Sequence, residues 1–280
     1  MEQDIFRKGS TTYYWSSLFF PKDVREDVFR FYSFVRVVDD YVDQITPNKK
    51  AYSAIKQAWR DASVLRNFDT TPIDGDGINE RVIKNIIHIC KKYDCDKEWV
   101  QSFFASMDMD MRKRRYTNID QTIEYIYGSA EVIGLFMARI MGLDPTADEF
   151  ARLQGRAMQF VNFIRDIAED NDLGRLYFPR EDLAQHGLRD LSETECRGKP
   201  EQFANFMRLQ VDRYESWQAT AREGFPYIPH RLRIPLRTAV GMYDWTAKQI
   251  ANDPFIVFSI KVKPSKYRVL YQALRSALLP

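Results

Sequence analysis

The 280-residue chain has few cysteines and almost no excess of charge of either sign. Its three cysteines, Cys90, Cys95 and Cys196, are too few for a disulfide framework, and one would be left unpaired. No partner cluster accompanies Cys90 and Cys95, so we expect reduced thiols in a cytoplasmic protein and no zinc site. Lysine and arginine total 41 against 39 aspartates and glutamates. Nucleic-acid binding is therefore not expected, because nucleic-acid binders usually carry a strong basic excess.

Long apolar runs are also missing. The N-terminal residues lack the apolar core and small-residue cleavage site of a signal peptide. The most apolar stretch, Val132 to Leu143, is interrupted by Arg139 and falls well short of the roughly 20 residues that span a bilayer. We predict a cytoplasmic protein whose contact with a membrane, if any, is peripheral.

What the sequence does contain is helical periodicity over most of its length. Apolar residues between Val24 and Ile45 recur at steps of three and four, which predicts one long amphipathic helix. Further helices are predicted at roughly 50–66, 80–93, 97–113, 119–142, 147–170, 201–223, 231–251 and 265–278. Strand-type alternation is absent, and the stretches 67–79 and 171–200 look non-helical without marking a domain boundary. The pattern predicts one all-α domain over residues 1–280, with a sizeable core because 45% of residues are hydrophobic.

One predicted helix is apolar nearly all round, from Ile123 to Gly142, which is typical of a buried helix. Its small residues Gly128, Ser129, Ala130 and Gly134 would let either a neighbouring helix or a ligand approach closely. Both interpretations stay open at this point.

Two other helices each carry a polar stripe beside an apolar face. The first stripe has steps of four, three and four and consists of Tyr32, Arg36, Asp39 and Asp43. The second has steps of three, four and four and consists of Gln159, Asn162, Asp166 and Asp170. Because successive helical residues lie about 100° apart, the first stripe borders the core face, and we expect it to line a cavity. The second stripe stands on a helix that is apolar on most of its other faces.

Divalent cations would stabilise both stripes. Polar groups on a buried helix are costly unless something satisfies them, and like charges four residues apart repel. Mg²⁺ prefers oxygen ligands and is typically held by one or two carboxylates together with substrate phosphates. Arg36 and Arg165 beside the carboxylates favour a polyanionic ligand, since guanidinium pairs well with phosphate oxygens. One such acidic pair is usually a solvated face, but two copies favour a metal–diphosphate clamp. A non-catalytic helical subunit with interhelical salt bridges is the alternative from another class.

At these positions the sequence resembles the squalene/phytoene synthase family of head-to-head prenyl transferases, and its phytoene synthases most. The matching segments cover essentially the whole chain in the family's order: Ser10–Tyr14, Tyr32–Asp43, Met107–Asp110, Tyr125–Ala130, Gln159–Asp170 and Arg175–Pro179. The resemblance implies an all-α isoprenoid-synthase helical bundle with a central cavity. It also implies condensation of two allylic prenyl diphosphates through a cyclopropylcarbinyl diphosphate. Two geranylgeranyl diphosphates giving phytoene is the main hypothesis, and a dehydrosqualene or squalene synthase using farnesyl diphosphate is the alternative.

The resemblance also implies roles for individual residues. The metal and diphosphate clamp would be formed by Asp39, Asp43, Asp166 and Asp170. The catalytic contacts to diphosphate or carbocation would come from Tyr32, Arg36, Arg165 and Tyr177. Substrate contacts would come from Ser10, Thr12, Tyr13, Tyr125, Gln159, Asn162, Arg175 and Tyr243. The family pattern is broken at Glu131, where many members have a small residue, and a C-terminal basic residue has only approximate counterparts in Lys261 or Lys263.

Substrate length and cofactor are further expectations. Ser17 follows Tyr13 by four residues in an otherwise aromatic segment, so a helix there places both on one face. A small side chain would leave space for a longer prenyl tail, and each buried CH₂ contributes about 0.8 kcal/mol, so C20 donors are predicted. The alternative is that Ser17 merely packs against another helix. Mg²⁺, or Mn²⁺ in its place, is the expected cofactor, and NADPH is not expected because a phytoene-type reaction ends by proton loss.

Overall fold

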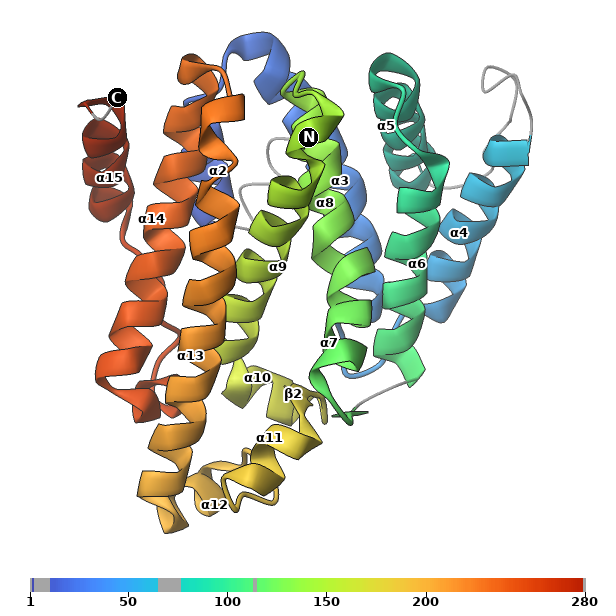
Figure 1. Ribbon diagram of the computed structural model, residues 1–280. Coiled ribbons are helices and arrows are strands. Elements are labelled where there is room, and N and C mark those ends of the chain that lie inside the picture. The colour runs from blue at the N-terminus through green and yellow to red at the C-terminus, as the bar shows by residue number, and fades with distance from the viewer. Residues whose placement is uncertain (1, 3–10, 65–76, 113–114, 279–280) are drawn as a thin grey trace.

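The structure is a computed structural model that describes residue 2 and residues 11–64, 77–112 and 115–278. Helices account for nearly all of it (Figure 1), which confirms the predicted all-α fold. The main helices are α2 (Thr11–Ser17), α3 (Lys22–Val42), α4 (Lys49–Val64), α5 (Ile78–Tyr93), α6 (Lys97–Arg112), α7 (Ile119–Ile126), α8 (Val132–Ile140), α9 (Asp148–Arg165), α10 (Ile167–Asp172), α11 (Arg180–Gln185), α12 (Glu193–Gly198), α13 (Pro200–Arg222), α14 (His230–Asn252) and α15 (Lys266–Leu278).

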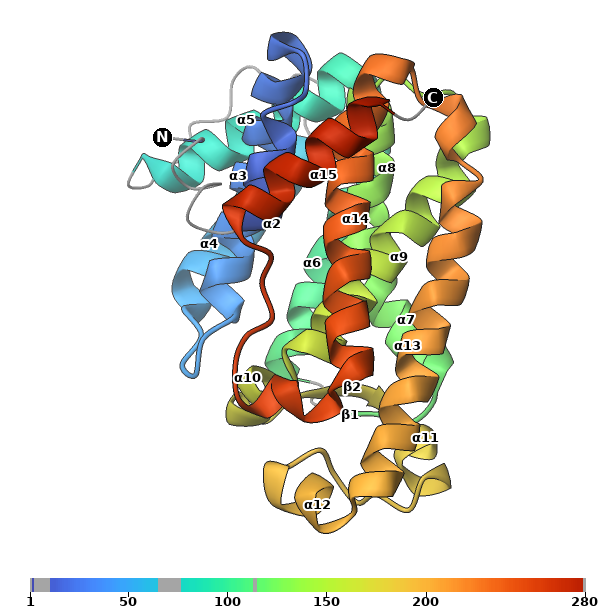
Figure 2. The ribbon, with the colours of Figure 1, turned by 90° about the vertical axis from the view of Figure 1, so that its left-hand side faces the viewer.

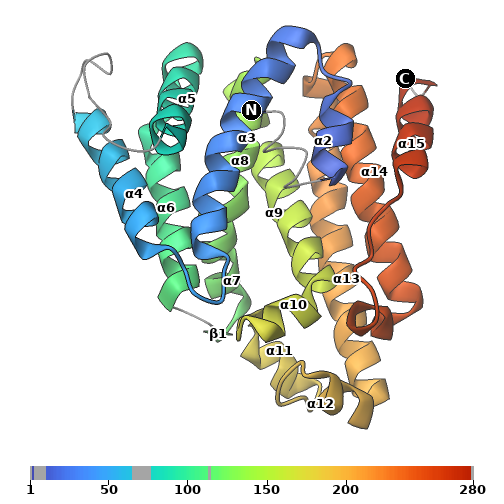
Figure 3. The ribbon, with the colours of Figure 1, turned by 180° about the vertical axis from the view of Figure 1, so that it is seen from behind.

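The long helices run roughly side by side, as Figures 1 and 3 show from opposite sides. Helix α9 packs against α8, α13 and α14, while α3 packs against α4, α5, α6 and α8. Helix α15 lies across the outside of α14 and α2 (Figure 2). The short helices α10, α11 and α12 gather at one end of the bundle (Figure 1). This arrangement leaves the middle of the bundle bounded by α3, α8, α9 and α14.

Helix α3 shows why the periodicity was informative. Its predicted apolar face is almost fully buried at Val28, Phe31, Val38 and Val42. Burying such side chains contributes roughly 1.5–3 kcal/mol each, which is what holds an amphipathic helix to the core. The helix ends at Val42, and Ile45, which the pattern included, lies beyond it with 85% of its surface exposed.

The predicted helix 119–142 is interrupted by a π-helical turn, η1 (Tyr127–Glu131), between α7 and α8. The small residues here serve close packing between helices. A Cβ at Gly128 would lie 2.0 Å from the backbone oxygen of Ser102 on α6, and a Cβ at Gly134 would lie 2.1 Å from that of Ala151 on α9. The neighbouring backbones therefore touch this segment directly, which confirms the helix-packing interpretation for these two glycines.

The predicted helix 147–170 is also broken, at Asp166. This residue has φ −100° and ψ 18°, so α9 ends at Arg165 and α10 begins at Ile167. The hydrogen-bond ladder survives on both sides, because Asp166 N–H donates to Asn162 O and Asp170 N–H donates to Asp166 O, each at 2.8 Å. The break changes the direction of the chain just where the second acidic stripe is richest in carboxylates.

The stretch 171–200 is more ordered than predicted. It holds α11, α12 and the strand β2 (Leu176–Pro179), which pairs in parallel with β1 (Arg115–Tyr116). The expectation of no strands was wrong here, because strands of two and four residues are too short to show alternation.

The three cysteines are free, as predicted, and the structure shows that all three are buried. In the described ranges, no helix combines the length and the apolar character needed to cross a bilayer.

Candidate active site

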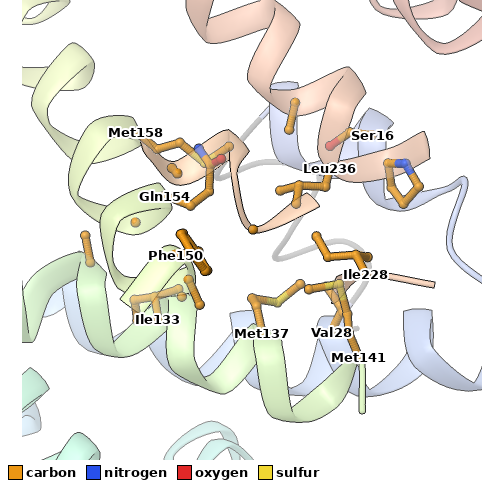
Figure 4. Close-up of a pocket in the computed structure, with 18 of the residues that line it drawn as sticks. Ser16, Val28, Ile133, Met137, Met141, Phe150, Gln154, Met158, Ile228 and Leu236 are labelled. Carbon is orange, nitrogen blue, oxygen red and sulfur yellow. The ribbon is translucent and has the colours of Figure 1, made fainter. Parts of the chain in front are cut away.

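A largely apolar cavity of about 250 Å³ lies between α2, α3, α8, α9, α13 and α14. Figure 4 shows its walls, with Ile133 and Met137 from α8, Phe150 from α9, Leu236 from α14 and Ile228 directed into it. Such a lining suits a hydrocarbon chain, because the apolar tail leaves water without leaving a polar group unpaired.

The polar stripes reach this cavity at one end. Tyr32 of α3 and Gln159 and Asn162 of α9 all line it. The prediction that the first stripe lines a cavity is therefore confirmed for Tyr32. The aspartates follow further along each helix: Asp39 comes two turns after Tyr32, and Asp166 comes one turn after Asn162.

On α3, the acidic group is tied to Arg36. Its guanidinium contacts Asp39 (Nη1–Oδ2 3.2 Å) and Asp40 (Nη2–Oδ1 2.5 Å). Burial and the neighbouring Asp43 carboxylate raise the pKa of Asp39 to about 7, although Arg36 opposes the shift. The ionised form of this carboxyl group is unfavourable because the group is buried beside other carboxylates. Added positive charge would therefore stabilise it.

On α9 and α10, Asp166 is the centre of a second ionic cluster. The Arg165 guanidinium makes a bidentate contact with the Asp166 carboxylate, at 2.7 Å (Nε–Oδ1) and 2.5 Å (Nη2–Oδ2). Lys261 Nζ lies 3.2 Å from Asp166 Oδ1 and also contacts Glu169. Burial and the Asp166 carboxylate raise the pKa of Asp170 well above its usual value. Lys261 is thus the lysine in direct contact with these carboxylates, and Lys263 interacts with them at longer range.

Arg175 joins the two clusters. Its Nη1 lies 2.6 Å from Asp43 Oδ1 and its Nη2 donates to Val42 O at 3.0 Å. The Arg175 side chain is 8% exposed, and it connects the end of α3 to the segment that leads into β2. This contact spans 132 residues of sequence, and it holds both acidic stripes at one end of the cavity.

Near Arg175 and Asp43 lies Asp110, the last residue of the Met107–Asp110 segment, to which the sequence assigned no role. Its two carboxylate oxygens accept hydrogen bonds from the hydroxyls of Tyr125 and Tyr177, both at 2.7 Å. Burial raises the pKa of Asp110 to about 6, against the lowering effect of Arg175 and the two hydroxyls. Both tyrosines, predicted to contact substrate or carbocation, are buried with their hydroxyls engaged by this carboxylate. Tyr177 also stacks on Phe163, with ring centroids 4.3 Å apart.

Other predicted residues fall into three groups. Ser17 lines the cavity beside Ser16, and its hydroxyl donates to Tyr14 O at 2.7 Å. Tyr243 is buried near Tyr32 and Arg165. Ser10 lies outside the described residues, and Thr12 and Tyr13 lie in α2 with side chains outside the description.

The departure at Glu131 has a structural explanation. The residue belongs to the π-turn and is fully buried, where its carboxylate is bound by Arg152 (2.9 Å) and Arg156 (2.6 Å) of α9. Its neighbour Ser129 lines the cavity and had no role assigned from the sequence beyond its small size. The Gly-Ser-Ala segment was the signal that pointed to it.

The donor set suits a hard divalent cation. Within the described ranges, no three acidic, histidine or cysteine side chains are gathered into a preformed metal cluster. Mg²⁺ does not require one, because it is usually held by one or two carboxylates with water and substrate phosphates. The buried oxygen Asn162 Oδ1 has no hydrogen-bond partner among the described residues, and it stands one turn before Asp166. An unpaired buried oxygen beside mutually repelling carboxylates fits an oxygen-liganded cation.

A helical bundle that encloses an apolar cavity, with carboxylates and arginines further along the helices that line it, has the fold of the isoprenoid synthases. The sequence pattern of squalene/phytoene synthases matches residues 6–268, and the chain belongs to that family. It is 28% identical over 242 residues to 15-cis-phytoene synthase of Paracoccus sp. (strain N81106 / MBIC 01143), covering 86% of this chain and 78% of that protein. It is 28% identical over 259 residues to chloroplastic phytoene synthase 1 of Arabidopsis thaliana, covering 89% of this chain and 59% of that protein.

The fold is similar to the crystal structure of a dehydrosqualene synthase in complex with ligand. The TM-score is 0.82 at 22% identity, over 98% of this chain and 93% of the other. The protein is accordingly a prenyl transferase that condenses prenyl diphosphates head to head.

Proposed function

We propose that the chain acts as one domain over residues 1–280 that joins two geranylgeranyl diphosphates to phytoene by way of prephytoene diphosphate. The observation that carries the proposal is the largely apolar cavity whose lining includes Tyr32, Gln159 and Asn162, the residues that lead along α3 and α9 to the acidic stripes. A prenyl diphosphate has the same division between a hydrocarbon tail and an anionic head. The relatives named as phytoene synthases support the choice of product.

The cationic side chains at the polar end would receive the diphosphate. Arg36, Arg165, Arg175 and Lys261 now neutralise carboxylates, and each is placed to pair with phosphate oxygens instead. Mg²⁺ or Mn²⁺ held by Asp39, Asp43, Asp166 and Asp170, with Asn162 Oδ1, would supply positive charge that stabilises the leaving diphosphate. The arginines orient the diphosphate so that the allylic C–O bond points into the cavity.

The cavity walls would protect the carbocation that follows. Its apolar lining excludes water, which would otherwise capture the cation. The rings of Phe31 and Tyr32 line the cavity near its polar end and can stabilise positive charge through their π faces. A phytoene-type reaction then ends when a proton is lost, so no hydride donor such as NADPH is required.

The product of the purified enzyme tests the proposal. Geranylgeranyl and farnesyl diphosphate would each be supplied with Mg²⁺ or with EDTA, and with or without NADPH. The extracted hydrocarbon would then be identified by mass spectrometry. We expect a C40 triene-centred product that needs the metal and is unchanged by NADPH. A C30 product alone would favour the dehydrosqualene or squalene alternative, and a product that appears only with NADPH would refute the phytoene assignment.

A further inference from the structure

Helix α15 exposes an apolar face. The exposed residues recur at steps of three, one and three, and their exposed fractions are 87% for Tyr267, 53% for Leu270, 63% for Tyr271 and 60% for Leu274. Ile260, just before the helix, is 59% exposed as well. Because an α-helix has 3.6 residues per turn, the four helical residues share one face. Clustered exposed apolar residues of this kind mark an interaction surface, whereas single ones do not.

The opposite face of α15 already has its packing partners. Val269 and Ala273 are buried where the helix lies on α14 and α2. Gly241 of α14 makes room for Gln272, whose Nε2 would lie 2.3 Å from a Cβ at that position. The outward face seen at the front of Figure 2 is therefore not needed to hold α15 in place.

Positive charge borders the apolar face on both sides. At about 100° per residue, Arg268 and Arg275 fall on one edge and Lys266 on the other. Residues 254–280 contain five lysines and arginines and no aspartate or glutamate. An apolar face with basic edges and interfacial tyrosines is the pattern of a helix that lies in the headgroup region of an anionic bilayer.

The basic residues at the edges of the α15 apolar face also argue against a second copy of the chain as its binding partner. In a symmetric dimer the same patch meets itself, so the basic edges of the two helices would face each other. An anionic lipid surface instead attracts each exposed basic residue by about 1 kcal/mol.

We propose that α15 docks the protein on an anionic lipid surface. The helices beneath it form the cavity wall on that side, through Ser16 and Ser17 of α2 and Leu236 and Ala239 of α14. Lys266 Nζ lies 5.2 Å from the ring centroid of Trp15, next to these serines. If the proposed function holds, this contact places the α2–α14 wall between the hydrocarbon product and the bilayer that would receive it.

Vesicle binding tests the proposal without any substrate, so its outcome is independent of the catalytic assignment. The protein would be sedimented with uncharged vesicles of pure phosphatidylcholine and with anionic vesicles that also contain about 30% phosphatidylglycerol. We expect binding to the anionic vesicles that weakens as salt is raised. The variant with Leu270→Asp and Leu274→Asp should bind at least tenfold more weakly. Arg275→Glu should bind at least about fivefold more weakly, because it removes one attracted charge and adds a repelled one.

Matched controls make the same chemical changes elsewhere. Ile45→Asp alters an exposed apolar residue outside α15, and Lys50→Glu reverses an exposed charge on α4. Both should bind vesicles like the wild type, and thermal melting would show that all variants are folded. Equal vesicle binding by a folded Leu270→Asp, Leu274→Asp variant would overturn the proposal. So would sedimentation equilibrium showing a wild-type dimer that this variant converts to monomer, because the face would then be a contact between copies.

Discussion

Replacing Asp39 by asparagine should stabilise the protein while abolishing its activity. The substitution keeps the shape of the side chain and removes a negative charge that burial and Asp43 make unfavourable, so that the pKa of Asp39 stands at about 7. It also removes a carboxylate that the proposed function assigns to the metal and diphosphate clamp. Stability and turnover are therefore expected to move in opposite directions.

The size of the stabilisation follows from the pKa. Its difference from the ordinary value of 3.8 corresponds to an upper limit of ~4 kcal/mol. The side chain is 35% exposed, so solvent screening reduces this, and we expect about 1–2 kcal/mol, or a rise in Tm of roughly 2–6 °C. The folded-state pKa lies above the unfolded one, so the wild type loses stability as the pH rises from about 4 to 7. The advantage of the variant is thus full above pH 7 and absent below about pH 4.

Melting in EDTA at pH 4, 6 and 8 would measure this, alongside diphosphate release in Mg²⁺. Turnover should fall by roughly 100-fold or more, as for the loss of a group that stabilises transition-state charge. Asp23→Asn, an exposed change in the first turn of α3, is the control and should leave turnover in place without raising Tm. A near wild-type rate in Asp39→Asn, or a melting temperature below that of the wild type at pH 8, would contradict the prediction.

Three further predictions concern other parts of the site. Ser17→Phe should shift preference from geranylgeranyl toward farnesyl diphosphate, and an unchanged ratio in a competition assay with folded variant would show that Ser17 does not gate length. Tyr125→Phe should lower the free energy of unfolding by about 1.5–3 kcal/mol at pH 8, where the tyrosine hydroxyl donates to an ionised Asp110. At pH 5 the loss should be only about 1 kcal/mol, because a pKa of about 6 leaves the Asp110 carboxyl largely protonated, and equal losses at both pH values in urea unfolding would contradict this. Gly155→Ala should destabilise by more than about 2 kcal/mol, because its Cβ would lie 2.2 Å from Ala130 O, and a Tm equal to that of the wild type would show that the helices can separate freely.

The sequence predicted the features that repeat within one helix. The apolar face of α3 and the step pattern of both polar stripes are local, so spacing alone predicted that the first stripe lines a cavity, as Tyr32 does; that Asn162 lines the same cavity is known only from the structure. Helix ends were found to within a few residues for the same reason. The break at Asp166 was not visible, because the residues on both sides continue the helical pattern.

Contacts between segments that are distant in the sequence could not be predicted from residue spacing within one helix. The partnership of Asp110 with Tyr125 and Tyr177 depends on how α6, α7 and β2 meet, and no spacing within any one of them encodes it. The same holds for Arg175 with Asp43. Glu131 was noticed only as a departure from the family pattern, and its two arginine partners stand on another helix.

The π-turn at Tyr127–Glu131 makes the packing of α7 and α8 more sensitive to the number of residues in this stretch than to their identity. A π-turn accommodates one more residue than an α-turn, so the loss of a single residue would let α7 and α8 fuse into one regular helix. Everything after the fusion would then be rotated by about 100° relative to what precedes it. Either Tyr125 would leave Asp110, or Ile133 and Met137 would leave the cavity wall. A one-residue deletion here is thus expected to be far more damaging than most substitutions, and shuffled or shortened variants of this enzyme should keep these five residues as an unbroken unit.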